Sequence, residues 1–79
     1  PVAPSATADG RLVVANDRGD DVQVLALGRA QARLEWFGHP GGTVVAVGTA
    51  GDLVVATTSR RQVVVYDASG RRLWTWATD

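Results

Sequence analysis

The stretch "VVVYDASGRRLWTW", residues 63–76, contains the features from which the fold can be inferred. The run Val63–Tyr66 favours a strand, because β-branched and aromatic side chains pack well on a pleated surface. The sequence Asp-Ala-Ser-Gly at 67–70 follows, and these residue types are typical of tight turns. Trp74 and Trp76 then lie two positions apart, so both point to one face of a second strand. The stretch therefore predicts a β-hairpin with an aromatic face.

Short apolar segments separated by turn residues extend along the whole chain. Valine dominates these segments, and no helical periodicity is present, so the pattern indicates an all-β protein. The expected strands are Arg11–Asn16, Asp21–Leu27, Ala32–Phe37, Thr43–Val47, Asp52–Thr57, Gln62–Asp67 and Arg72–Ala77, with a weaker one within Val2–Ala8. The Gly-rich sequence "GTAGD", Gly48–Asp52, precedes a strand and not a helix, so it indicates a turn and not a phosphate-binding loop.

The chain also repeats itself. "DGRLVVA" at 9–15 matches "AGDLVVA" at 50–56, and "VQVLAL" at 22–27 matches "VVVYDA" at 63–68, both 41 residues later. With one deletion, "LEW" at 34–36 aligns with "WTW", which sets Leu34 opposite Trp74. Matching blocks in one order along the chain indicate two copies of a unit of about 40 residues.

We therefore predict two repeats, 1–40 and 41–79, joined by the Gly- and Pro-rich sequence "GHPGG", Gly38–Gly42. Four short strands per unit of about 40 residues are typical of a β-propeller blade. Segments such as "LVVA" and "VVVY" are apolar on both faces, as expected of strands packed between neighbouring blades. A small barrel or sandwich would instead leave one strand face polar. The expected fold is two four-stranded antiparallel blades.

The second repeat resembles the quinoprotein-type (PQQ-like) propeller repeat. Members of that family carry a strand, an Asp, a Thr/Ser-Gly-Lys/Arg turn and a tryptophan that docks between blades. The residues that match this docking motif are Asp67, Ser69, Gly70, Arg71 and Trp74, with one residue fewer than usual between the Asp and the Ser. The first repeat lacks the Asp. WD40-like and YVTN-like propellers have similar blades and stay as alternatives.

We expect each part of this motif to have a structural role. Gly70 can adopt a positive φ in a tight hairpin, and Asp67 can accept hydrogen bonds from backbone N–H groups of the turn. Trp74 is expected to fill the gap between two blades, with Tyr66 and Trp36 adding to the same kind of contact. Trp74→Ala should then be more damaging than Trp36→Ala.

Composition argues against several classes of function. Eight basic and eight acidic residues balance, so a basic nucleic-acid surface is not expected. The apolar runs are far shorter than the ~20 residues needed to cross a bilayer, so no membrane insertion is expected. There is no cysteine, and His39 is the only histidine. The clusters by which redox quinoproteins hold their quinone and cation are not recognisable, so we expect no enzyme, cofactor or metal site.

Charged residues cluster in three turns, Asn16–Asp21, Ser59–Arg61 and Gly70–Arg72. The first two of these turns and the connector Gly38–Gly42 are expected on one side of the blades, which we call the loop face. In a four-stranded blade, the turns after the second strand and the connectors between blades emerge on one side. Such turns commonly serve only to keep a protein soluble, and propellers also use them for binding. The candidates for ligand binding are Asp17, Arg18, His39, Arg60 and Arg61.

The function predicted from these features is a binding or scaffold module with a protein or glycan partner. One alternative is a fragment of a quinone-dependent dehydrogenase-like propeller, and another is a blade-repeat assembly without activity of its own. Two blades leave two apolar faces bare, and such faces mark interfaces. We expect other blades to cover them, either by self-association as a trimer or tetramer or from a longer chain, which the start at Pro1 permits.

Overall fold

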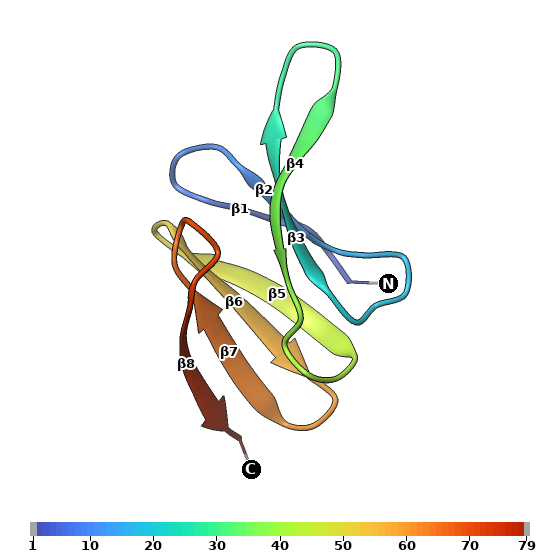
Figure 1. Cartoon of the computed structure of the whole chain (residues 1–79), viewed down its shortest axis with the longest axis vertical. Helices are drawn as coiled ribbons and strands as arrows, with labels where there is room; N and C mark the ends of the chain where they lie inside the picture. Colours follow the sequence, from blue (N-terminus) through green and yellow to red (C-terminus); the bar gives the residue numbers. More distant parts are fainter. Residues whose placement is uncertain (1, 79) are drawn as a thin grey trace.

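The computed structural model describes residues 2–78, and all regular secondary structure in this range is β-strand (Figure 1). The all-β prediction is therefore confirmed. The outer bounds predicted for the repeats, Pro1 and Asp79, lie outside the described residues. The strands are β1 (Ser5–Ala6), β2 (Leu12–Ala15), β3 (Val22–Leu27), β4 (Ala32–Gly38), β5 (Val44–Ala50), β6 (Leu53–Thr58), β7 (Gln62–Tyr66) and β8 (Arg72–Ala77).

The strands form two antiparallel sheets in the orders β1-β2-β3-β4 and β5-β6-β7-β8. We call them blade 1 and blade 2. Figure 1 shows blade 1 above blade 2, with the β3–β4 hairpin of blade 1 projecting away from the rest of the chain. The predicted division after residue 40 falls in the connector between β4 and β5 and stays a prediction. No helix in the described part of the chain is long and apolar enough to cross a membrane.

One predicted turn is shorter than expected. Within "GTAGD", Gly48 and Thr49 still belong to β5, where they pair with Val55 and Val54. Only the last two residues of that sequence, 51–52, make the turn, with Gly51 at a φ of 62°. A single tight hairpin suffices here, so β5 runs three residues beyond the predicted end at Val47.

The core lies between the blades. Directly paired residues of antiparallel strands share a face, so the register shows which side chains meet. Val24 pairs with both Val13 and Trp36, and this row belongs to the face of blade 1 that covers blade 2. The core consists of Val13, Val22, Val24, Val54, Ala56, Val64 and Tyr66, with Trp36 and Val47 packed against it.

The other side of blade 2 is its outer face, defined by the paired rows Val55–Val65–Trp74 and Thr57–Val63–Trp76. Val65 is nevertheless buried there, at 4% exposure, whereas both tryptophans are about half exposed. The strands of blade 2 are thus apolar on both faces, as predicted for blades, and one apolar face is open.

The register corrects the alignment of the two repeats. Val24 pairs with Trp36 in blade 1, and its counterpart Val65 pairs with Trp74 in blade 2. Trp36, not Leu34, is therefore the equivalent of Trp74. The alignment from sequence was wrong because it introduced one deletion, whereas the β3–β4 hairpin is three residues longer than the β7–β8 hairpin.

Candidate functional site at the blade interface and the loop face

Trp36 of blade 1 docks on the β7–β8 turn of blade 2. Its indole Nε1–H donates a hydrogen bond to the carbonyl of Ala68 at 3.0 Å. A Cβ added at Gly70 would stand 2.8 Å from Cδ2 of Trp36, so the indole lies directly on the glycine backbone. The Trp36 and Tyr66 rings lie 5.5 Å apart between centroids, tilted by 47°. This interface therefore needs a glycine at position 70 for close approach as well as for its φ of 93°.

Asp67 holds this turn in shape. Its Oδ1 accepts hydrogen bonds from the backbone N–H groups of Ser69 and Arg71, both at 2.9 Å, and from the Ser69 hydroxyl at 2.8 Å. The bond from the Arg71 N–H, followed by the one from the Ser69 side chain, lowers the pKa of the Asp67 carboxyl. We call residues 67–70 the docking turn, because Asp67 fixes the loop that offers the Ala68 carbonyl to blade 1.

Arg11 makes a second contact with the same carbonyl. Its Nη1 donates to the Ala68 oxygen at 2.8 Å and to Oε1 of Glu35 at 3.3 Å, while its Nε donates to Oδ1 of Asp9 at 3.1 Å. The Arg11 side chain is only 12% exposed. Sequence reasoning missed Arg11 and its partner Glu35, because only the folded sheet brings these distant residues together.

Trp74 does not lie between blades 1 and 2. It is 49% exposed on the outer face of blade 2, where it stacks on Trp76 with centroids 5.9 Å apart and rings within 8° of parallel. The role expected of Trp74 is filled at this interface by Trp36, because the docking tryptophan contacts the turn of the following blade and not its own. Contact of Trp74 with a further blade stays a prediction.

The three segments of the loop face come together at one end of the blades, as Figure 1 shows at the lower right. The Gly19 carbonyl accepts a hydrogen bond from the Val44 N–H at 2.6 Å, and the Thr43 carbonyl accepts one from the Ser59 N–H at 2.8 Å. The β2–β3 turn, the connector and the β6–β7 turn are thus joined through their backbones.

The candidate binding residues divide into two groups on this face. Asp17 and Arg18 are exposed and line an open hollow of about 410 Å³ beside blade 1. Arg60 lies against Gly42, and the Arg61 carbonyl accepts a hydrogen bond from the Thr78 hydroxyl at 3.0 Å. Within residues 2–78, no ion pair or hydrogen bond connects the first group with the second.

His39 belongs to a small cluster that sequence reasoning missed. Its Nδ1 lies 2.8 Å from Oδ1 of Asp21, and ligand atoms of Asp20, Asp21 and His39 all lie within 4.8 Å of one another. Each acid already has a protein partner, since the Asn16 amide donates to Asp20 and lowers the pKa of that carboxyl. The cluster is therefore explained as a contact that joins the β2–β3 turn to the connector.

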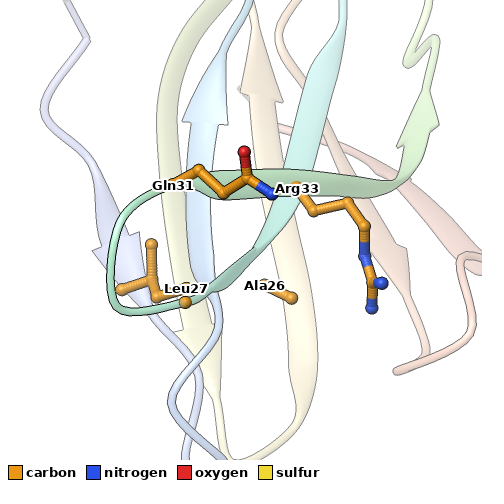
Figure 2. Close-up of a pocket in the computed structure, with 5 residues that line it drawn as sticks. Ala26, Leu27, Gln31 and Arg33 are labelled. Atoms are coloured by element: carbon orange, nitrogen blue, oxygen red, sulfur yellow. The ribbon is translucent and has the colours of Figure 1, made fainter.

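The hairpin of blade 1 that corresponds to the docking turn is built differently. It closes through a hydrogen bond from the Gly28 N–H to the Gln31 carbonyl at 2.8 Å. Figure 2 shows Gln31 and Arg33 on one side of this hairpin and Ala26 and Leu27 on the other, around an open cavity of about 250 Å³. No Asp lies at this turn, so blade 1 has no equivalent of the Asp67 loop.

No protein-family model and no curated protein matches the chain. Among solved structures, the chain is similar to BamB from Moraxella catarrhalis, with a TM-score of 0.79 and 19% sequence identity. The match covers 98% of this chain and 24% of the BamB chain, so the chain spans about a quarter of that β-propeller protein. At this level of sequence identity, the structural similarity shows the fold alone. Together with the two four-stranded sheets, it identifies the chain as a pair of β-propeller blades.

Proposed function

We propose that the chain is a non-catalytic scaffold of the quinoprotein type, in which two docked blades present the loop face to a protein partner. The observation that carries this proposal is the contact of Trp36 with the docking turn. An indole of one blade lies on the glycine of an Asp-Ala-Ser-Gly turn in the next, and its N–H is bonded to the Ala68 carbonyl at 3.0 Å. This contact agrees with the quinoprotein resemblance in one respect, since that resemblance implies a tryptophan that docks between blades.

The loop face supports a binding role because hydrogen bonds hold the backbone of its turns in place, while its charged side chains are exposed. Asp17, Arg18, Arg60 and Arg61 are exposed on turns that are hydrogen-bonded to one another or to neighbouring strands. Charges of both signs on a rigid turn favour a protein surface with complementary charges, which gains specificity and association rate from such pairs. The zero net charge of the chain argues against nucleic acid as the partner.

Two charge-reversal variants test the binding surface. In the first, Asp17→Arg, Arg18→Glu and Arg60→Glu change the loop face. In the control, Arg29→Glu and Arg33→Glu change the projecting β3–β4 hairpin. Partners captured from an extract of the source organism by the unaltered chain are purified and titrated against both variants by calorimetry.

We expect the loop-face variant to lose about tenfold or more in affinity, which corresponds to about 1.4 kcal/mol, while the control keeps its affinity. Equal binding by both variants would show that the partner does not use this face. Loss of binding in the control alone would move the site to the β3–β4 hairpin.

A further inference from the structure

At the interface between the blades, a glycine of blade 1 lies against a large aromatic side chain of blade 2. A Cβ added at Gly38 would stand 2.7 Å from Cε2 and Cζ of the Tyr66 ring. Tyr66 is only 3% exposed, and its ring is the aromatic neighbour of the docking indole of Trp36. Gly38 on blade 1 therefore makes the space that Tyr66 of blade 2 fills.

The outer face of blade 2 repeats this arrangement with one change. Val22 pairs with Gly38 in blade 1, and its counterpart Val63 pairs with Trp76 in blade 2. Trp76 thus stands where blade 1 has Gly38, just as Trp74 stands where blade 1 has Trp36. The rings of Trp76 and Trp74 lie 5.9 Å apart and are stacked within 8° of parallel, whereas those of Trp36 and Tyr66 lie 5.5 Å apart and are tilted by 47°. A large ring of the same strand, that of Trp76, thus already lies beside Trp74.

We propose that the outer face of blade 2 accepts a further blade that carries a docking turn of the Asp-x-Ser-Gly pattern and a short side chain in place of Tyr66. Trp76 sets this specificity, since two large rings cannot share one volume in a close-packed interface. The inference rests on the proposed function, because it takes the interface between blades 1 and 2 as the pattern for the next one.

A second copy of this chain does not meet both conditions. Its blade 2 has the docking turn but also has Tyr66, which would meet Trp76. Its blade 1 has the shorter Leu25 in the place of Tyr66, but the β3–β4 hairpin lacks the Asp and closes through Gly28 and Gln31 instead. The occupant is therefore a blade of different sequence, and not a copy that closes a trimer or tetramer of this chain.

Appending a third blade to the full chain tests the role of Trp76. The probe is a copy of residues 41–79 fused after Asp79, in which both tryptophans of the copy are replaced by phenylalanine. Three fusion proteins are compared. In the first, the copy has no further change, and in the second the tyrosine of the copy that is equivalent to Tyr66 is changed to Ala. In the third, the copy is as in the first, but the chain to which it is fused carries Trp76→Gly. Labelling with 5-fluorotryptophan lets ¹⁹F NMR resolve each indole, and the solvent-isotope shift reports its exposure to water.

We expect Trp74 to lose its solvent-isotope shift in the second and third proteins and to keep it in the first. Loss of the shift in all three would show that Trp76 does not select the next blade. A shift retained in all three would show that the outer face takes no blade of this kind. The Trp36 signal in the same spectra tests the proposed function separately, because a Trp36 as exposed to water as the undocked Trp74 would contradict the docking of blade 2 on blade 1 itself.

Discussion

Trp36 and Trp74 occupy the same register position in the two blades, yet their surroundings differ. Trp36 lies on the docking turn of the following blade and donates its indole N–H to the Ala68 carbonyl. Trp74 is half exposed and stacks on Trp76 of its own strand. We therefore expect a docking tryptophan to contribute to stability only when the next blade supplies a turn for it. Motif residues near one another in the sequence therefore act at different interfaces.

The largest expected effect comes from removing the docked indole. Trp36→Ala should destabilise the chain by about 3 kcal/mol, because it opens a cavity beside Tyr66 and leaves the Ala68 carbonyl with fewer donors. Trp74→Ala should cost about 1 kcal/mol or less, since half of that side chain is already in water. Urea unfolding followed by far-UV circular dichroism measures both, and a larger cost at Trp74 would reverse the comparison.

Gly70→Ala should have the next largest effect, about 2–3 kcal/mol. The added methyl group meets the Trp36 ring at 2.8 Å, and the backbone φ of 93° is strained for residues with an L side chain. Gly41→Ala is the matched control, because Gly41 has a φ of 99° but open space around its Cβ position. The same unfolding assay should give it only the backbone strain of about 1 kcal/mol. Equal costs would mean that Trp36 does not lie on Gly70.

A smaller effect is expected from the pH dependence of the docking turn. Hydrogen bonds hold the pKa of the Asp67 carboxyl below its ordinary value, first of all the one from the Arg71 N–H. The carboxylate therefore stabilises the folded state above about pH 4, and this contribution is lost as the pH falls through the lowered folded pKa.

The melting temperatures of the unaltered chain and Asp67→Asn should thus differ at neutral pH and converge at acid pH. Asp52→Asn is the control, because Asp52 forms no side-chain hydrogen bond within the described residues. A gap between the unaltered chain and Asp67→Asn that stays constant down to pH 2 would show that the Asp67 carboxylate does not hold the turn.

We expect no binding of the quinone cofactor to the chain. Purified chain mixed with pyrroloquinoline quinone and Ca²⁺ should give no absorbance from bound cofactor after gel filtration. Bound cofactor at a stoichiometric ratio would contradict the scaffold proposal and favour the dehydrogenase-like alternative. The measurement also separates a docking role of the tryptophans from a role as a ligand platform.

Local chemistry made much of the fold predictable. Valine-rich strands, turn residues and two-sided apolar segments indicate two four-stranded sheets, and the structure has them. Asp67 and Gly70 could be assigned to a tight turn because their roles depend on neighbours two to four residues away. The interface could not be predicted to the same degree. It depends on a three-residue difference in hairpin length, which shifts Trp36 rather than Leu34 into register with Trp74.

Contacts between segments that lie far apart in the sequence could not be predicted either. Arg11 reaches Ala68 across 57 residues, and His39 meets Asp21 only because Gly38 pairs with Val22. No local pattern marks either pair. The loop-face segments could be grouped from the order of strands in a blade, but the separation of Asp17 and Arg18 from Arg60 and Arg61 depends on how one blade sits on the other.

Hydrogen exchange at the three tryptophan indoles measures directly which of them is docked between the blades. NMR at neutral pH follows the Nε1–H signals of Trp36, Trp74 and Trp76 in the intact chain. We predict that the Trp36 signal exchanges with solvent roughly tenfold more slowly than the other two, because its proton is bonded to the Ala68 carbonyl. A protected Trp74 beside a freely exchanging Trp36 would show that Trp36 is not the tryptophan docked between the blades.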